Sequence, residues 1–390
     1  MKILFVKESQ NWPRASGHDV HGYHMMHSLA QLGHSISLLT ASTPNPTGIQ
    51  GIDFEWLGNF GDLPTPSQKP ALPKLQSKFC SYWGIDIQRP QQIHDLVRGN
   101  GFHAVVVVGL HVLPYLACVK NSVRVWYAAD EWLLHHWSQF KLSKKSTWGN
   151  LKEGLVKGLY EYAFSRCTDR VWVVSKKDAS MARWVMPRSS IDVIANGVDA
   201  NHFDPSSQPG YSEPLQTRGL VFWGRLDFGP NIDAIDWFCR KVWTKLVKQR
   251  PDIDWTVYGF QAGSEVRALA AEFGFKLVPD LPDLRSEIMK HKVVVLPFVS
   301  GAGIKNKFLE AAAMARPIVA SARALNGVEL NGERPCCVAG NVTEWIEHIA
   351  RLYDSAEECK LAGEKARLWV MKNYSWERAA KLASRSLALH

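Results

Sequence analysis

Residues 293–310 are the segment that most constrains how this chain folds. They read VVVLPFVSGAGIKNKFLE: a short apolar run, a loop with Gly301 and Gly303, then a helix-forming stretch. A strand that is apolar on both faces is typical of a parallel sheet covered by helices. Glycines let backbone N–H groups approach a ligand where a helix N-terminus carries about half a positive charge. The segment therefore predicts a phosphate site on an α/β sheet. The lysines followed by a glutamate indicate a nucleotide with a sugar part.

The rest of the chain repeats this alternation in two halves. At 390 residues it exceeds one ordinary hydrophobic core. Predicted strands of the first half are 3–6, 36–40, 104–108, 123–128 and 171–174, with a helix over 18–32 and loop with short elements over 44–90. Predicted strands of the second half are 220–223, 255–258, 293–297 and 317–321, with helices over 232–248 and 264–273. Asn196-Gly197-Val198-Asp199 is a turn signal that marks the boundary. Each half is therefore expected to form its own Rossmann-like sheet.

Composition limits the class of protein. With 46% hydrophobic and 21% charged residues the chain is typical of a soluble globular protein. It contains no apolar run near the ~20 residues that span a bilayer, and its first residues read as a strand, not a signal peptide. Its seven cysteines form no C-x-x-C pair, so we expect reduced thiols in a cytoplasmic protein.

The net charge of +9 is concentrated in the first half. Most of the excess lies in residues 141–188, where tryptophan and tyrosine are interspersed with the basic residues. Two interpretations stay open: a solvated basic face, or peripheral docking on the anionic inner face of the cell membrane. In the second case each basic residue would contribute about 1 kcal/mol. No nucleic-acid-binding motif accompanies the charge, so we predict no nucleic-acid partner.

Several short motifs follow one another in a distinctive order along nearly the whole chain. They are Ser16-Gly17 before a helix that ends at Gly33-His34, Asn196-Gly197-Val198-Asp199 with Phe203 and Pro205, Gly224-Arg225-Leu226 with Pro230-Asn231, Glu310-Ala311-Ala312-Ala313, and Tyr374-Ser375-Trp376. In this order and spacing the chain resembles the GT-B glycosyltransferases, in particular glycosyltransferase family 4.

The resemblance implies a fold, an activity and roles for residues. It implies two Rossmann-like domains facing a cleft: an acceptor domain of residues 1–197 that the C-terminal helix 375–390 rejoins, and a donor domain of residues 198–374. In the family, the glutamate at the position of Glu310 hydrogen-bonds the donor ribose. The glycine loop, here with Gly301 and Gly303, holds the diphosphate. Arg225 and a lysine would offset the charge of the leaving group. The resemblance also implies retention of anomeric configuration, with a nucleotide sugar as substrate and no cofactor.

The chain departs from the family pattern at two places. The family often has a first glutamate eight residues before the second, where this chain has Ala302. The lysine that often follows the arginine is replaced by Gly229-Pro230-Asn231, so Lys305 or Lys307 would have to supply that charge. Helical phase favours Lys307, because residues three apart lie on one helix face and Glu310 follows three later. A surface ion pair between Lys307 and Glu310 is the alternative.

Arg225 directly follows a predicted strand, at the carboxyl end where α/β sheets bind ligands. Its fork of N–H donors suits phosphate oxygens. A structural salt bridge is the alternative interpretation.

Candidate acceptor residues lie at strand ends of the first half: Gly17, His18, His21, His111, Asp130 and Glu131. Asp130 follows the strand 123–128, and its carboxylate would bind the acceptor hydroxyl or act as a general base. Its alternative role is a helix N-cap. His18, His21, His24 and His27 do not form a metal site, because nine helical residues advance about 900° and point His18 and His27 in opposite directions. No Asp-x-Asp motif sits at a strand end, so we predict metal-independent transfer.

The sequence therefore predicts transfer of a sugar from a nucleotide donor to a hydroxyl of a glycan or lipid-linked acceptor, in polysaccharide or glycolipid synthesis. Catalysis would depend on Arg225, Lys307 and Asp130. Two alternatives remain: an epimerase or hydrolase of nucleotide sugars on the same fold, and a non-catalytic nucleotide-sugar-binding protein. A dehydrogenase is disfavoured, because residues 5–17 contain no Gly-x-Gly-x-x-Gly.

Overall fold

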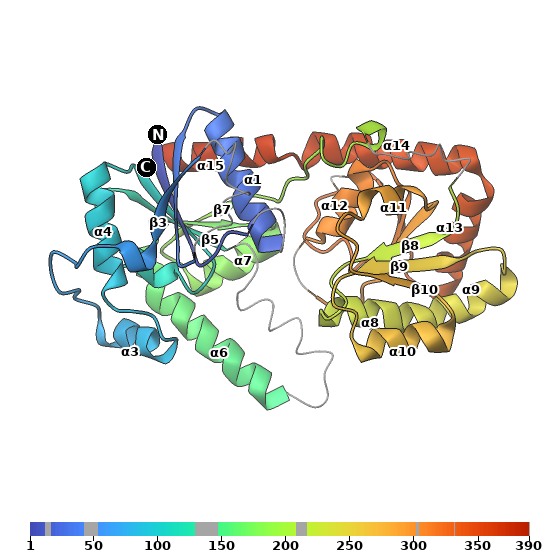
Figure 1. Cartoon of the computed structure of the whole chain (residues 1–390), viewed down its shortest axis with the longest axis horizontal. Helices are drawn as coiled ribbons and strands as arrows, with labels where there is room; N and C mark the ends of the chain where they lie inside the picture. The colour runs from blue at the N-terminus through green and yellow to red at the C-terminus, as the bar shows by residue number, and fades with distance from the viewer. Residues whose placement is uncertain are drawn as a thin grey trace. The chain divides into compact units, whose positions relative to one another are not determined.

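The computed structural model describes residues 1–11, 17–42, 54–128, 147–207, 217–301, 304–330 and 332–389. The chain divides into two compact units (Figure 1). Unit 1 consists of Met1–Asn196 and Trp376–His390, and unit 2 of Gly197–Ser375. Each unit is an α/β structure built around a parallel sheet.

In its described part, unit 1 has a seven-stranded sheet in the order β3-β2-β1-β4-β5-β6-β7, and all neighbours pair in parallel. The strands are β1 (Lys2–Lys7), β2 (Ser35–Thr40), β3 (Phe54–Asn59), β4 (Ala104–Val108), β5 (Val123–Ala128), β6 (Arg170–Val173) and β7 (Ser190–Val193). The helices are α1 (Gly17–Gln31), α3 (Lys74–Tyr82), α4 (Arg89–Asn100), α6 (Thr147–Phe164), α7 (Lys176–Val185) and α15 (Trp376–Ala388), with short turns η1 (Phe60–Asp62), η2 (Leu113–Leu116) and η3 (Ser165–Cys167). The segment 44–90, predicted as loop with short elements, contains β3, η1, α3 and the start of α4 among its described residues. The sequence did not identify β3 or β7 as strands.

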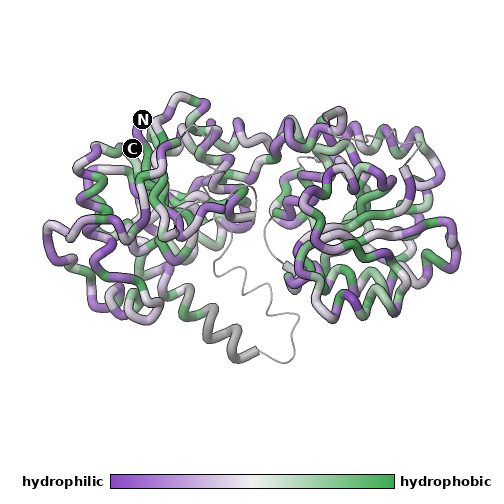
Figure 2. Tube along the Cα trace, in the orientation of Figure 1, coloured by the Kyte–Doolittle hydropathy of each residue, from purple (hydrophilic) through white to green (hydrophobic). Residues whose placement is uncertain are grey.

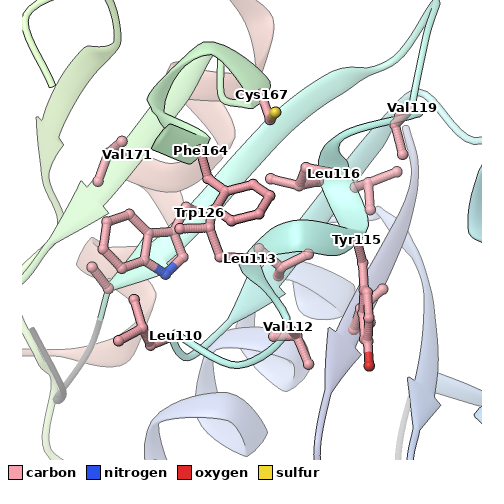
Figure 3. Packing of buried hydrophobic residues seen from close by; sticks show 14 of the residues in the cluster. Leu110, Val112, Leu113, Tyr115, Leu116, Val119, Trp126, Phe164, Cys167 and Val171 are labelled. Atoms are coloured by element: carbon pink, nitrogen blue, oxygen red, sulfur yellow. The ribbon is translucent and has the colours of Figure 1, made fainter. Parts of the chain in front are cut away.

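The core of unit 1 lies on both faces of its sheet. Strand β4 is buried along its whole length, as its run of valines requires in a sheet covered on two sides. On one face the ring of Trp126 from β5 lies beside Phe164 from α6, with Leu113 next to them (Figure 3). On the other face the core includes Trp172 from β6 and Trp376 from α15.

The C-terminal helix α15 belongs to unit 1, although the chain reaches it from unit 2. It lies beside α1 (Figure 1). The indole N–H of Trp172 donates to Ser386 Oγ at 2.9 Å. His34, which follows α1, forms a hydrogen bond of 2.8 Å between its Nε2 and Ser384 Oγ. These bonds fix the helix that the family resemblance places with the first domain.

Unit 2 has, among its described residues, a six-stranded parallel sheet in the order β10-β9-β8-β11-β12-β13. The strands are β8 (Leu220–Trp223), β9 (Trp255–Gly259), β10 (Lys276–Pro279), β11 (Val293–Leu296), β12 (Ile318–Ala320) and β13 (Cys337–Val338). The helices are α8 (Gly229–Phe238), α9 (Thr244–Gln249), α10 (Ser264–Phe273), α11 (Arg285–Met289), α12 (Asn306–Ala313), α13 (Val342–Asp354) and α14 (Ala356–Asn373), with the turn η4 (Pro205–Ser207) and the π-helical segment η5 (Cys239–Trp243) between α8 and α9. Helix α10 matches its predicted bounds, whereas β10 and β13 were not predicted.

Apolar residues are concentrated on the central strands of both units, and polar residues on the outer helix surfaces (Figure 2). All seven cysteines are free thiols. Among the described helices, none is long and apolar enough to cross a membrane.

Each sheet has one point at which the order of the strands reverses. This point lies between β1 and β4 in unit 1, and between β8 and β11 in unit 2. Because parallel crossovers are right-handed, the helices on either side of such a point cover opposite faces of the sheet. The loops at the carboxyl ends of the two strands then diverge and leave room for a ligand. The fold therefore points to the loops after β8 and β11, and to those after β1 and β4.

Candidate functional site

Two lysines lie at the start of α12, directly after the loop that follows β11. Lys305 is the N-cap of the helix, and Lys307 is in its first turn. Their amino groups lie 5.5 Å and 5.6 Å from the centre of the Phe298 ring, which is buried at the end of β11. The face of an aromatic ring attracts cations. Two positive charges are therefore held near one buried ring at the N-terminus of a helix, where an anion is favoured.

The Lys307 amino group also approaches β8 and the first turn of α8. It lies 5.8 Å from the centre of the Phe222 ring, and it donates a hydrogen bond of 3.2 Å to Asn231 Oδ1. Removal from water lowers the pKa of Lys307 to about 8, while the charge of Glu310 acts in the opposite direction. A group that gives up its proton this readily gains from a bound anion, because the anion restores the stability of the charged form.

Glu310 lies one turn further along α12. Its Oε2 accepts a hydrogen bond of 3.1 Å from the indole N–H of Trp223, the last residue of β8. Trp223 is buried, whereas Glu310 is half-buried. The bond holds the Glu310 carboxylate against the end of β8. No ion pair between Lys307 and Glu310 is present in the described part of the chain.

Arg225 follows β8 by two residues and forms a two-pronged ion pair with Asp227. Its Nε donates to Asp227 Oδ1 at 3.1 Å and its Nη2 to Oδ2 at 2.7 Å. The hydrogen bonds to Asp227 raise the pKa of the Arg225 guanidinium, and the same bonds lower the pKa of the Asp227 carboxyl. The Arg225 side chain is 57% exposed, so water screens this pair and a phosphate can compete with it. Asp227 carries no recognisable motif in the sequence and was not among the predicted site residues.

The backbone of the loop after β11 requires glycine at Gly301. Its φ is +89°, a left-handed conformation that other residues rarely adopt. A Cβ there would lie 3.0 Å from Lys305 Nζ and 3.2 Å from Pro230 Cβ. The preceding Ser300 is buried and donates from its Oγ to Asp233 on α8 at 2.6 Å. The start of the loop is therefore held in place, with the Lys305 amino group close above it.

The structure thus brings together five of the predicted donor residues: Arg225, Gly301, Lys305, Lys307 and Glu310. Asn231 bonds Arg225 and Lys307, and Trp223 bonds Glu310. Gly303 and Ala302 lie outside the described residues. Helical phase does not describe the position of Lys305. Because α12 begins at Asn306, Lys305 does not follow the helical phase, and its amino group approaches the same aromatic ring as that of Lys307.

In unit 1, two predicted acceptor residues belong to the loops at the reversal point. Gly17 begins α1, after the loop that follows β1. His111 follows β4, is half-buried and meets Trp83 edge-on, with ring centres 5.4 Å apart. Its loop is anchored by two donors: Trp126 Nε1 to the Gly109 carbonyl at 3.1 Å, and Tyr160 Oη to the Leu110 carbonyl at 3.0 Å.

His21 does not lie at the surface. It is 1% exposed, and its ring meets Trp376 of α15 edge-on at 5.8 Å. His24 stacks on the same indole at 5.2 Å. In this structure both histidines pack α1 against α15, which leaves His21 no open surface for an acceptor. The side chain of His18 lies outside the described part, as do Asp130 and Glu131.

A buried polar cluster at the end of β1 was not anticipated. Lys7 is fully buried; its Nζ donates to Gln10 Oε1 at 2.8 Å and to Asp19 Oδ1 at 3.3 Å. Gln10 in turn donates from Nε2 to the Asp19 carbonyl at 2.9 Å. The cluster ties the end of β1 to the first turn of α1. The apolar run of β1 ends at Val6, and this pattern gave no reason to expect the lysine that follows it to be buried.

Within the described residues, no group of three or more histidine, cysteine, aspartate or glutamate side chains could hold a metal ion. The charges gathered around α12 are instead basic. An anionic ligand is therefore the chemistry that these side chains suit.

Comparison with known proteins agrees with this chemistry. Residues 217–355, which include the whole site around α12, match the family described as "Glycosyl transferases group 1". The comparison with curated proteins gives no significant match.

Solved structures of glycosyltransferases are similar over nearly the whole chain. Sucrose-phosphate synthase from Thermosynechococcus elongatus is 16% identical, with a TM-score of 0.68 and 100% of both chains covered. HepE from Anabaena, in complex with UDP and glucose, is 14% identical, with a TM-score of 0.66 and 100% of this chain and 99% of that chain covered. TarM from S. aureus, in a complex with α-GlcNAc-glycerol and UDP, is 10% identical, with a TM-score of 0.67 and coverage of 99% and 100%. At these identities the likeness shows the fold. The predicted GT-B fold and the predicted resemblance to this group of glycosyltransferases are confirmed.

Proposed function

We propose that this protein transfers a sugar from a nucleotide-sugar donor, bound by unit 2, to a hydroxyl of a glycan or lipid-linked acceptor, bound by unit 1. The observation that carries the proposal is the cluster around α12. Lys305, Lys307 and Arg225 lie at the reversal point of the unit 2 sheet, with the Glu310 carboxylate one turn away. The match of this segment to group 1 glycosyltransferases supports the same function.

The proposed chemistry follows from the charges. The diphosphate of the donor would lie at the N-terminus of α12, near the two lysine amino groups and Gly301. The ribose hydroxyls would donate to Glu310. As the bond from the sugar to the diphosphate breaks, negative charge accumulates on the departing phosphate, and Lys307 and Arg225 stabilise it. We propose that transfer proceeds with retention and without a metal or a cofactor. Asp130 and the acceptor roles of Gly17, His18 and His111 remain predictions.

The experiment that tests the function is a transfer assay preceded by a thermal-shift screen with UDP-, GDP- and ADP-sugars. The HepE and TarM structures make UDP the first probe. A transferase releases nucleoside diphosphate much faster with acceptor than without it. Equal release from donor alone would indicate the hydrolase or epimerase alternative. Donor binding without turnover on any acceptor would indicate the non-catalytic binding protein.

Glu310→Ala is expected to weaken the binding of a nucleoside diphosphate by about 10-fold to about 150-fold. The reason is that a hydrogen bond to a charged group contributes about 1.5–3 kcal/mol. Glu310→Gln should lie between this variant and the wild type. Isothermal titration calorimetry with UDP measures both. Trp223→Phe serves as the control, because it removes the indole N–H that bonds Glu310 while it leaves the carboxylate in the chain. If Trp223→Phe weakens binding as much as Glu310→Ala, the carboxylate acts on packing alone and not on the ribose.

We also propose that unit 1 docks on an anionic membrane surface through helices α3 and α6. The two helices pack together: Gln76 Nε2 donates to the Ala163 carbonyl at 2.9 Å, and the rings of Phe79 and Tyr160 meet edge-on at 5.4 Å. The proposed docking surface would use the exposed apolar residues Leu75, Tyr82, Leu155, Leu159 and Tyr162 of the two helices, with the exposed basic residues Lys74 and Lys78 of α3 and Arg166 of η3. An interfacial helix combines these two kinds of residue. This surface would place the enzyme on the cytoplasmic side of the membrane, beside a lipid-linked acceptor.

Replacing Leu155, Leu159 and Tyr162 with serine is expected to lower binding to vesicles of anionic phospholipid by at least about 10-fold. Each exposed apolar side chain that enters the interface contributes through the area it removes from water. Cosedimentation with phosphatidylglycerol vesicles measures the loss. The matched control is Leu361→Ser with Leu368→Ser, two exposed leucines of α14 in unit 2. Equal binding by the triple variant and this control would contradict the docking surface, as would equal binding to neutral phosphatidylcholine vesicles.

A further inference from the structure

Asn231 lies in the first turn of α8 and uses both ends of its side-chain amide. The residue is 2% exposed, so its amide must find partners inside the protein. Its Nδ2 donates to the Arg225 carbonyl at 2.6 Å, and its Oδ1 accepts from Lys307 Nζ at 3.2 Å. A backbone carbonyl can only accept and an ammonium can only donate, so the orientation of the amide is fixed. Asn231 therefore joins the loop after β8 to the first turn of α12.

The Lys307 ammonium depends on this amide for its position. Among the described residues, Asn231 Oδ1 is the hydrogen-bond acceptor that reaches it; its other close neighbours are the rings of Phe222 and Phe298. An ammonium has three N–H donors, so two remain for a ligand. The Asn231 amide is also neutral. It holds the ammonium without cancelling its charge, which a carboxylate at the same place would do.

We propose that Asn231 is a positioning residue that holds the Lys307 ammonium toward the diphosphate of the donor. The inference rests on the proposed function, because it assigns Asn231 to the same donor site. It also answers a question that the sequence raised. The family's lysine after the arginine is missing here, and the residues that replace it end in Asn231. That segment supplies no charge itself, but it holds the lysine of α12 that does.

The first test measures Lys307 directly, without a ligand. Competitive labelling with acetic anhydride across a range of pH, read by mass spectrometry of the peptide that contains Lys307, gives the pKa of this amine. The wild-type midpoint is expected at about 8. The charged group that acts on this amine is Glu310 on α12, and Lys305 lies beside the same Phe298 ring. Neither residue changes in the variants.

Asn231→Asp is expected to raise this midpoint by about 1 pH unit or more, because a carboxylate within hydrogen-bond distance favours the ammonium. Asn231→Ala is expected to lower it, since the amide oxygen that accepts a hydrogen bond from the charged amine is lost. The matched controls are Asn100→Asp and Asn100→Ala. The Asn100 amide likewise donates to a backbone carbonyl, that of Leu96 at 2.9 Å, but in α4 of unit 1. Midpoints for both Asn231 variants that equal those of the controls would overturn the proposal.

The second test asks whether Asn231 acts on the ligand through Lys307. UDP affinity is measured by calorimetry, near neutral pH, for Asn231→Ala, Lys307→Met and the double variant. Asn231→Ala should weaken UDP binding at least about 5-fold in the wild-type background and by less than about 2-fold in the Lys307→Met background, as for residues coupled by direct contact. Equal weakening in both backgrounds would show that Asn231 acts independently of Lys307. Failure of UDP, GDP and ADP alike to bind the wild type would overturn the proposed function, while the labelling midpoints still decide whether Asn231 holds Lys307.

Discussion

Arg225→Ala is expected to lower the turnover of glycosyl transfer by about 30-fold to about 1,000-fold, which corresponds to about 2–4 kcal/mol of transition-state stabilisation. Arg225 follows the end of β8 and pairs with Asp227. Its side chain is still 57% exposed to solvent. Because exposed ion pairs are screened by water, exchange of the Asp227 carboxylate for a phosphate costs little. The effect should fall mainly on turnover, since the leaving phosphate gains charge only as the bond to the sugar breaks. Steady-state kinetics with the donor found by screening measures it.

The alternative for Arg225 is a structural salt bridge with Asp227, and two controls separate the roles. Arg225→Lys keeps the charge but loses the two-pronged geometry, so turnover should recover only in part. Asp227→Asn removes the partner and leaves the guanidinium in place, so it should keep most of the turnover. Thermal unfolding should be nearly unchanged in all three variants. A purely structural bridge would give the reverse pattern: Arg225→Ala and Asp227→Asn would lower the melting temperature alike, with turnover per folded molecule unaffected.

The strands that the sequence predicted and those that it missed differ in one physical respect. The nine predicted strands occupy the interior of the two sheets, where both faces are buried and the residues form continuous apolar runs. Within the described residues the four missed strands, β3, β7, β10 and β13, are the strands at the sheet edges. Their side chains are mostly half-buried or exposed. An edge strand needs less apolar sequence, so hydrophobic runs alone do not identify it.

The candidate site shows a similar limit. Gly301, Lys307 and Glu310 could be predicted because they follow one strand in a short, recognisable segment. The roles of Asn231 and Trp223 could not, because each depends on a hydrogen bond to α12 across more than seventy positions, Asn231 to Lys307 and Trp223 to Glu310. The pairing of β8 with β11 is what brings these positions together. Asp227 was missed for a different reason: a carboxylate two residues after an arginine is common on protein surfaces and carries no signal by itself.

Gly224→Ala is expected to have the second large effect, and it tests the packing on which the site depends. Gly224 separates β8 from Arg225, and its φ is +151°, where residues other than glycine are strained. A Cβ at this position would lie 2.5 Å from Lys307 Cε, 2.6 Å from Lys307 Nζ and 2.9 Å from Asn231 Nδ2. These distances are far below van der Waals contact, so the Lys307 side chain must move away from Asn231. The sequence identified this glycine only as part of a motif, and the structure supplies the reason for it.

We expect Gly224→Ala to lower the free energy of unfolding by about 1–3 kcal/mol, the usual cost of a strained backbone conformation. UDP binding by the folded variant should fall to the level of Lys307→Met, because both changes remove the same ammonium from the site. Urea denaturation measures the first quantity and calorimetry the second. Gly263→Ala is the matched control: it precedes α10, and a Cβ there meets no atom within 4 Å. Wild-type affinity for UDP in folded Gly224→Ala would mean that the Lys307 ammonium is not required where the structure holds it, and the donor site would then have to lie elsewhere on the carboxyl edge of the sheet.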